Sequence, residues 1–318
     1  MTGTLKILVN DPGTGNVTGS KFINLESQSR SLVLYLPATG DATVIDTYSS
    51  PSYAPHFKRP YTIDDRLFIS DKYTNGGSLS LTEYDPSTLN RLGSWQTQND
   101  VDDPTYALVN DQVYYRTNTE EHIRFTGTTI TGGKIIRSPL VDSTQQSVLN
   151  ERNSYVQLLA SEGVLYGSTS PTDRDPLTGV FMVDETTGLP GDYLVAFEVD
   201  NLGNYLPGSW QEPVVDNGTA YWAAARRTAN GPVMEVWSYD LSVESGEVVG
   251  NSFQLSSDDG NIVSISGIDA DSGLVLVRTT FEGGDYSKVF LYDAHDGSAD
   301  VFDTGFRIMD AEVLYLDG

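Results

Sequence analysis

The stretch YALVNDQVYYR, residues 106–116, joins two short apolar segments through the tight polar turn Asn-Asp. Two β-branched or aromatic segments that flank a two-residue polar turn are typical of a β-hairpin. The same arrangement recurs along the chain, with turns that contain Asp-Asp, Glu-Gly, Asp-Asn-Gly or Asp-Ser-Gly. The seven occurrences are residues 21–36, 61–70, 106–116, 155–167, 212–224, 263–277 and 307–316.

A second kind of hairpin follows most of these units. Residues 81–95, LTEYDPSTLNRLGSW, place an Asp and a polar turn between two apolar strands. We expect Asp85, Pro86 and Gly93 to shape this turn and Trp95 to pack between units, so that each unit contains four antiparallel strands. Related stretches occupy residues 196–210, 235–249 and 289–302, and a near-copy, ILVNDPGTGNVTGS, occupies residues 7–20.

Four strands repeated about seven times over 318 residues give about 45 residues per unit, which is the period of a β-propeller blade. We therefore predict an all-β fold in which residues 1–318 form a single β-propeller domain of seven blades, each of four antiparallel strands. Six blades is the alternative, if residues 21–36 are not a first-and-second strand pair. Residues 169–190 are predicted to be an insertion or loop within a blade.

The ends of the chain predict how the ring closes. The chain begins on a predicted third-and-fourth strand pair, at residues 4–9 and about 17–22, and it ends on a predicted first-and-second strand pair at 306–316. Neither pair has the other half of a blade beside it in the sequence. The N- and C-terminal strands are therefore predicted to share one blade.

The hairpins also carry a family resemblance. YDPSTLNRLGSW and YDAHDGSADVF are similar to the third-to-fourth strand hairpin of quinoprotein-like and YVTN-type β-propellers. The resemblance covers most of the chain as a repeat and implies a propeller. The superfamily includes quinone-cofactor dehydrogenases, outer-membrane assembly scaffolds, surface proteins and lyases, and no cofactor-binding residue set matches. We therefore predict no cofactor.

Composition excludes several classes of protein. The chain has no cysteine, which excludes disulfides, thiolate metal sites and cysteine nucleophiles. Its 44 acidic and 19 basic residues give a net charge of −25, which repels nucleic acid and anionic membranes. No apolar run approaches the ~18 residues of a membrane span, so membrane insertion is not expected. We expect a secreted, periplasmic or cell-surface protein, with the cytoplasm of a halophile as the alternative.

Ligands of propellers usually meet the end of the ring formed by the second-to-third and fourth-to-first strand loops, and many of the chain's cations fall there. Arginine suits carboxylate and phosphate recognition. Alternatively, each Arg pairs with an Asp of a neighbouring blade. Nearby Tyr73, Tyr114, Tyr115, Tyr166 and Trp222 either stack on sugar rings or pack in the core. The candidate ligand-binding residues are His56, Lys58, Arg59, Lys72, Arg116, Arg152, Trp210, Arg226, Arg227, Arg278 and Arg307.

These residues predict a non-catalytic binding or assembly module for a glycan, another small or anionic ligand, or a protein partner. One alternative is a glycoside hydrolase or polysaccharide lyase that uses Asp102, Asp103 and Asp258 with Arg116 and Arg278. A structural or surface-layer role is the other alternative.

Calcium is the metal that the sequence allows, because Asp-rich turns can supply the oxygen ligands that it prefers. Those same turns are also ordinary hairpin connections. The candidate ligands are Asp269, Asp271, Asp293 and Asp296.

Overall fold

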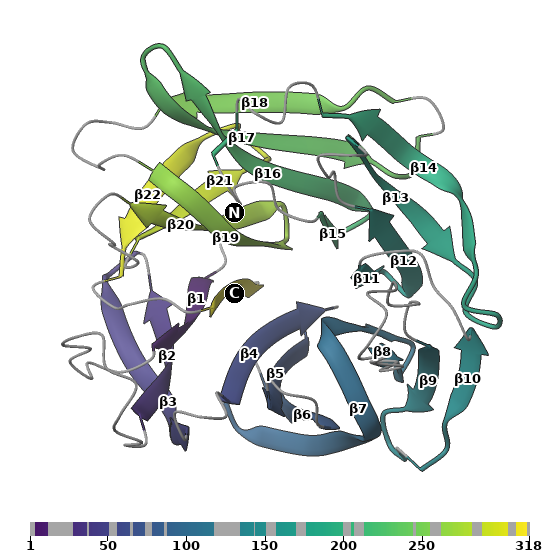
Figure 1. The fold of residues 1–318 in the computed structure, drawn as a ribbon. Coiled ribbons are helices and arrows are strands. Elements are labelled where there is room, and N and C mark those ends of the chain that lie inside the picture. Colours follow the sequence, from purple (N-terminus) through teal and green to yellow (C-terminus); the bar gives the residue numbers. More distant parts are fainter. Residues whose placement is uncertain are drawn as a thin grey trace, which may run out of the picture.

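The computed structural model shows a ring of small antiparallel sheets, with both chain termini near its centre (Figure 1). The described elements are all β-strands, which confirms the all-β fold and the propeller arrangement. Among the described residues, no helix is long and apolar enough to cross a membrane. For some strand residues, mainly in the first third of the chain, only the backbone is described. The described residues are 4–11, 28–36, 38–50, 56–63, 66–73, 78–85, 88–117, 134–142, 144–150, 157–169, 176–199, 205–206, 213–243, 246–254, 262–281, 288–304 and 310–316.

Four of the described sheets have four strands each. The closure blade contains β23 (Asp310–Leu316), β1 (Thr4–Asp11), β2 (Gln28–Leu36) and β3 (Asp41–Ser50). The next contains β11 (Gln157–Ser161), β12 (Val164–Thr169), β13 (Leu177–Val183) and β14 (Pro190–Glu198). It is followed by β15 (Val214–Asp216), β16 (Thr219–Thr228), β17 (Gly231–Asp240) and β18 (Val249–Gln254). The last contains β19 (Ile262–Asp271), β20 (Leu274–Phe281), β21 (Lys288–Asp293) and β22 (Ala299–Asp303).

The fifth described sheet has seven strands and lies between the closure blade and the β11–β14 sheet (Figure 1). Its long strand β7 pairs with β6 through its first half and with β8 through its second half. Two four-stranded units thus share one strand. The strands are β4 (His56–Ile63), β5 (Arg66–Tyr73), β6 (Ser78–Tyr84), β7 (Arg91–Val109), β8 (Gln112–Thr117), β9 (Ile135–Pro139) and β10 (Ser147–Asn150).

Counted as continuous sheets, the described residues form five blades, so the predicted seven and the alternative six are wrong. Two features account for the difference. Residues 28–36 form the strand β2, while 21–27 lie outside the described residues, and residues 42–48 lie in β3 of the same sheet, so a blade predicted as separate belongs to the closure blade. The continuity of β7 then merges two further units into one sheet.

The termini close the ring, as predicted, but not with the predicted division of strands. Residues Thr4–Asn10 of β1 pair antiparallel with Leu316–Asp310 of β23. The C-terminus contributes only the first strand of the closure blade, and the N-terminus contributes the other three. The N-terminal motif copy at residues 7–20 therefore starts in a second strand, and residues 12–20 lie outside the described residues.

The predicted first-to-second strand hairpins are confirmed at residues 61–70, 106–116, 155–167, 212–224 and 263–277. In four of them both turn residues have positive φ, as a type I′ turn requires. Residues 310–316 instead form the single strand β23. The four turns are Asn110-Asp111, Glu162-Gly163, Asn217-Gly218 and Ser272-Gly273.

The motif at residues 81–95 is a third-to-fourth strand hairpin, as predicted. The Asp85 N–H donates to the Asn90 carbonyl at 2.9 Å, and the Leu89 N–H donates to the Asp85 carbonyl at 2.7 Å. The same two bonds recur in the turns 184–189 and 293–298. Asp85 therefore shapes the turn, whereas Gly93 lies in β7 opposite Glu83 and Pro86 lies outside the described residues. In the copy at residues 196–210, residues 196–198 lie in the fourth strand β14 and not in a third strand as predicted, and residues 200–204 and 207–210 lie outside the described residues.

Trp95 packs between two four-stranded units, as predicted. It is 5% exposed, and its indole N–H donates to the Pro139 carbonyl at 3.0 Å. Its ring meets Tyr115 edge-on with centroids 6.1 Å apart. Because β7 runs directly from one unit into the next, its tryptophan fills the space between them.

The segment 169–190, predicted as an insertion, contains regular structure. Residues Leu177–Val183 form β13, which pairs with β12 and β14. Asp184 then opens the turn to β14 by accepting the N–H groups of Thr186 and Thr187. Residues 170–175 lie outside the described residues.

The first-to-second turns of neighbouring units contact one another at one end of the ring. At one turn Nη1 of Arg66 lies 2.8 Å from Oδ1 of Asp111, and at another Oδ2 of Asp216 accepts the Gly273 N–H at 2.9 Å. Between them, Asn110 lies against Gly163 and Glu162 against Gly218. We call this end the turn face. Because second strands run away from it, they end at the opposite end, which we call the candidate face.

Ring closure predicts a crosslink between the termini. Ile7 faces Val313 and Leu8 faces Glu312 in the register of β1 and β23, and successive pairs alternate in geometry, so one pair should suit a disulfide. We expect one of the double-cysteine variants to crosslink and to gain up to about 5 kcal/mol of unfolding free energy. Mass spectrometry and chemical denaturation with and without reductant measure this, with the single-cysteine variants as controls. Termini that fail to crosslink in both pairs contradict this closure.

Burial gives Asp216 a distinctive pH dependence. Desolvation raises the pKa of this carboxyl despite its bonds from the Gly273 and Ser272 N–H groups. The folded state disfavours the ionised form of Asp216. Its contribution to the free energy of unfolding is therefore full below the pKa of the unfolded chain and is lost as the pH rises through the higher pKa of the folded protein. We expect Asp216→Asn to become progressively more stable than the wild type as pH rises above about 4 in urea denaturation.

Asp184→Asn provides the control of opposite sign. Hydrogen bonds from the Thr187 and Thr186 N–H groups lower the pKa of Asp184 in the folded protein. Its contribution to the free energy of unfolding is therefore full above the pKa of the unfolded chain and is lost as the pH falls through the lower pKa of the folded protein. Parallel pH profiles for the two variants would contradict this assignment.

Candidate functional site

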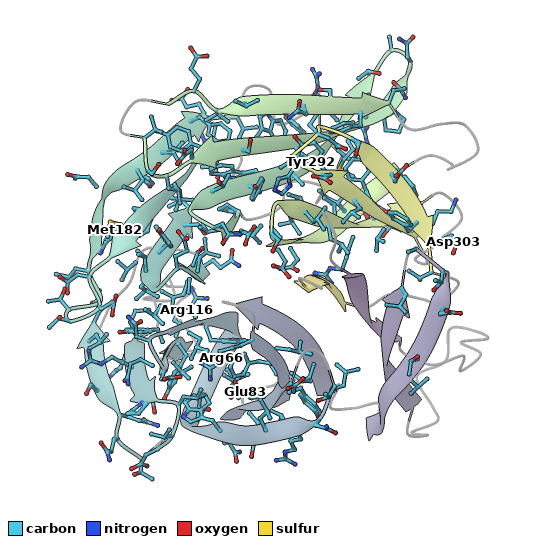
Figure 2. The ribbon with its side chains drawn as sticks, turned by 180° about the vertical axis from the view of Figure 1, so that it is seen from behind. Arg66, Glu83, Arg116, Met182, Tyr292 and Asp303 are labelled. Carbon is cyan, nitrogen blue, oxygen red and sulfur yellow. The ribbon has the colours of Figure 1, made fainter. Side chains whose placement is uncertain are left out.

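The described second strands bring several candidate arginines to the candidate face. Arg116 lies one residue from the end of β8, Arg226 and Arg227 lie in the last three residues of β16, and Arg278 lies in the second half of β20. Arg116, Arg226 and Arg278 are partly exposed, and Arg227 is exposed. Figure 2 places Arg116 close to the middle of the ring.

The remaining candidates are described by backbone only or not at all. His56, Lys58 and Arg59 lie in β4, where they pair with Tyr73, Asp71 and Ser70 of β5, and Lys72 pairs with Phe57. These pairs place the backbone of all four residues toward the candidate face. Their side chains, and all of Arg152, Trp210 and Arg307, lie outside the described residues.

Arg226 is held by a buried carboxylate of its own sheet. Its Nε lies 2.6 Å from Oε1 of Glu235, a residue that is only 6% exposed. Tyr205 O–H donates to Oε2 of Glu235 at 3.4 Å, and Ser252 Oγ donates to Oε1 at 3.3 Å. Glu235 therefore gathers three polar side chains around one carboxylate. The sequence does not predict this role of Glu235, since VMEVW, residues 233–237, has the pattern of an ordinary strand.

Arg278 is placed by a glycine on the innermost strand. Gly267 of β19 lies directly opposite Arg278 in the register, and the guanidinium occupies the space where a Cβ of residue 267 would be. The missing side chain thus lets the guanidinium lie across the inner strand. A positive charge is brought to the inner edge of its blade.

Two buried polar atoms on the β11–β14 sheet lack hydrogen-bond partners among the described residues. They are Oγ of Ser168, a residue that is 0% exposed, and Oε1 of Gln157. The two residues face each other across β11 and β12. Buried polar groups without partners are uncommon in folded proteins and call for a water or ligand.

Most nearby aromatic residues belong to the core. Tyr114, Tyr115, Tyr166 and Trp222 are each at most 7% exposed. Trp222 donates its indole N–H to Oγ1 of Thr178 on the neighbouring sheet at 3.2 Å and meets Phe197 edge-on. Side chains alternate between the two faces of a strand, and these rings point into the core between sheets. The prediction that they pack in the core is therefore confirmed for these four residues.

Charge is segregated between the two ends of the ring within the described residues. The first-to-second and third-to-fourth turns hold many acids, whereas the ends of second strands and starts of third strands hold cations. The acids are Asp85, Asp111, Asp142, Glu162, Asp184, Glu185, Asp216, Asp240, Asp293 and Asp296. The cations are Arg116, Lys134, Arg226, Arg227, Arg278 and Lys288. The segregation is incomplete, because Arg66 and Arg91 lie at the acidic end and Glu198, Glu235 and Asp303 lie at the cationic end.

Arg66 shows that an arginine can tie units together here. Its Nε contacts Glu83 of its own unit at 2.8 Å, while Nη1 reaches Asp111 of the next unit (Figure 2 shows Arg66 and Glu83). This is the alternative role considered for the candidate arginines, although Arg66 lies on the turn face. Arg226 differs, because its acidic partner Glu235 belongs to its own four-stranded unit.

The four calcium candidates lie in or beside turns. Asp293 Oδ1 accepts the His295 N–H at 2.8 Å, and Asp296 Oδ1 accepts the Ser298 N–H at 2.8 Å. Asp269 and Asp271 lie in the last three residues of β19, before the turn to β20. The part of the chain that the structure describes contains no group of three or more acidic or histidine side chains arranged to hold a metal ion. Calcium binding stays a prediction.

Comparisons with known proteins support the fold and not a family. No protein-family model and no curated protein matches the sequence. A chain of the nidogen/laminin complex matches with a TM-score of 0.50 and 11% identity, covering 97% of this chain and 98% of that chain. At this identity the similarity shows the fold alone.

Two further solved structures are more distant in shape. A mutant of the Synechocystis apocarotenoid oxygenase has a TM-score of 0.49 and 11% identity, covering 91% of this chain and 71% of that chain. A protein of unknown function from Desulfotomaculum acetoxidans has a TM-score of 0.43 and 9% identity, covering 97% of this chain and 79% of that chain.

The packing of Arg278 on Gly267 predicts coupling between the two residues. Gly267→Ala should displace the flexible guanidinium rather than the backbone, so the protein should still fold. In the Arg278→Ala background the added methyl group has room, so the same substitution should cost less. We expect a coupling free energy of about 1 kcal/mol in a denaturation double-mutant cycle. Gly93→Ala, which meets no atom within 4 Å, is the control. Additive effects of Gly267→Ala and Arg278→Ala would contradict the contact.

Proposed function

We propose that this β-propeller is a non-catalytic, extracytoplasmic binding module that takes an anionic or polyhydroxylated ligand, such as a glycan, on its candidate face. One observation carries the proposal: the described arginines at the second-strand ends gather at one end of a strongly acidic protein, while the described turn carboxylates lie at the other. Such segregation orients an approaching anion toward the cationic end. Arginine then offers paired N–H donors to a carboxylate or sulfate.

The placement of Arg278 supports this proposal. A guanidinium laid over Gly267 is positioned on the inner strand, where it can meet a ligand near the axis of the ring. Arg116 ends the second strand of another unit, so the two arginines belong to different blades. A ligand that spans the middle of the ring could contact both.

We also propose membership of the quinoprotein-like and YVTN-type superfamily, which the hairpins at residues 81–95 and 289–302 support. Both are third-to-fourth strand hairpins whose turns share the same backbone hydrogen bonds. No cofactor-binding residue set of this superfamily matches the chain, so membership is compatible with a binding module that has no cofactor.

The test is the double variant Arg116→Ala/Arg278→Ala, with oligogalacturonate and a sulfated oligosaccharide as probes. We expect the wild type to bind at least one of them, more weakly at higher salt, and the double variant to bind about tenfold more weakly. Isothermal titration calorimetry measures the affinities. Arg91→Ala removes an exposed cation beside a third-to-fourth turn on the opposite end and should leave binding unchanged.

Two results would overturn the proposal. Unchanged binding in the double variant together with a lower melting temperature would assign these arginines to holding the blades together. Turnover of either oligosaccharide that depends on candidate-face residues would favour the carbohydrate-active enzyme instead.

A further inference from the structure

The guanidinium of Arg226 is oriented by Glu235 and still has donors to offer. Glu235 engages Nε at 2.6 Å, and the side chain of Arg226 is 42% exposed. No contact of its two terminal amino groups is found among the described residues. Glu235 therefore fixes the plane of the guanidinium and leaves its outer edge for a ligand. A fixed donor loses less conformational freedom when it binds.

The ion pair of Arg226 and Glu235 has no net charge, and this indicates which class of ligand it can bind. Arg226 and Glu235 neutralise one another, so the pair adds no attraction for an anion on a protein of net charge −25. Its N–H donors suit hydroxyl or carbonyl oxygens equally well. The pair therefore fits a neutral, hydroxyl-bearing ligand, unlike the anion role proposed for Arg116 and Arg278.

Aromatic rings lie beside the same carboxylate. The rings of Tyr205 and Trp237 have centroids 6.4 Å apart, and both residues are partly exposed. A Cβ at Gly250 would come within 2.9 Å of Cδ1 and Nε1 of Trp237, so this edge of the indole lies next to the outer strand β18. Aromatic faces next to hydrogen-bond donors match the alternating C–H and O–H surface of a sugar ring.

The neighbouring sheet supplies polar groups to the same inter-sheet space. Leu159 and Tyr166 pack with Trp222 in one cluster, so Gln157 and Ser168, two residues along their strands, face the β15–β18 sheet. Arg226 lies four residues beyond Trp222 and faces the β11–β14 sheet in turn. The partnerless atoms of Gln157 and Ser168 and the open edge of Arg226 therefore border the same space near the candidate face.

We propose that the space between the β11–β14 and β15–β18 sheets holds a subsite for a neutral sugar ring, in which Arg226 and Tyr205 contact the ring and Glu235 positions Arg226. The ring's hydroxyl groups, directly or through a water, supply the partners that Gln157 and Ser168 lack. This inference deepens the proposed function, because it names a ligand class and a subsite on the same face.

The test compares two arginines at opposite ends of the ring. Arg226→Ala removes the subsite donor, whereas Arg91→Ala removes an exposed cation beside a third-to-fourth turn at the other end. The probes are neutral gluco-, manno- and galacto-oligosaccharides, with oligogalacturonate as the carboxylated counterpart. By calorimetry we expect at least one neutral probe to bind about tenfold more weakly to Arg226→Ala and within about twofold of wild type to Arg91→Ala.

Two further variants separate positioning from mere stability. Glu235→Gln keeps the shape of the side chain but leaves Arg226 without its counter-charge, so we expect neutral probes to bind more weakly and oligogalacturonate more tightly. Ser168→Ala removes a buried hydroxyl that has no partner, so the free protein should keep or gain thermal stability while affinity for the neutral probe falls. A purely structural role would not reverse selectivity in this way.

The failure of this inference is distinguishable from the failure of the proposed function. Neutral probes that bind equally to Arg226→Ala and wild type would overturn the subsite, while the loss of oligogalacturonate binding in Arg116→Ala/Arg278→Ala would still support the proposed function. The absence of neutral-probe binding to the wild type would also overturn the subsite. Equal losses in Arg226→Ala and Arg91→Ala would overturn it in favour of general surface charge.

Discussion

The antiparallel pairing of β1 with β23 is the constraint on which the rest of the ring depends. Neighbouring four-stranded units contact one another around the ring, and the described apolar clusters fill the spaces between such units. A row of such sheets would expose one apolar face at each end unless it closed on itself. By pairing the first strand of a blade with the second from the other end of the chain, the protein covers both faces at once.

The two ends of the ring carry different kinds of contact. On the turn face, short type I′ turns contact one another through Arg66, Asp111, Asp216 and Gly273, which joins neighbouring units. Tight turns that hold each other leave little freedom for a ligand. Second strands run away from these turns, so their last residues, which include Arg116, Arg226 and Arg278, lie at the candidate face.

The candidate face shows how one residue type acquires different chemistry from its surroundings. Arg226 forms an ion pair with the buried Glu235. The pair has no net charge, but the N–H donors of the guanidinium are held in a fixed orientation. Arg278 instead owes its position to the absence of a side chain at Gly267. The two arginines thus support proposals for two ligand groups, a hydroxylated ring and an anion, within one face.

The sequence by itself determined the all-β class, five of the seven first-to-second strand hairpins and the closure of the ring, because these follow from local turn chemistry and period-2 alternation. Asp85 and Trp95 could be assigned in this way. The blade count could not, because nothing local shows that β7 passes from one unit to the next without a break. AYWAAARR, residues 220–227, is compatible with a helix and yet lies in β16, since sheets cover both of its faces.

The candidate site, too, was predicted only in part from the sequence. Strand periodicity placed Arg116, Arg226 and Arg278 at one end of the ring, because second strands all end there. Only the tertiary structure joined Arg226 to Glu235 and Tyr205, or laid Arg278 over Gly267. These contacts link residues on different strands, and their register depends on pairing across the sheet rather than on any local pattern.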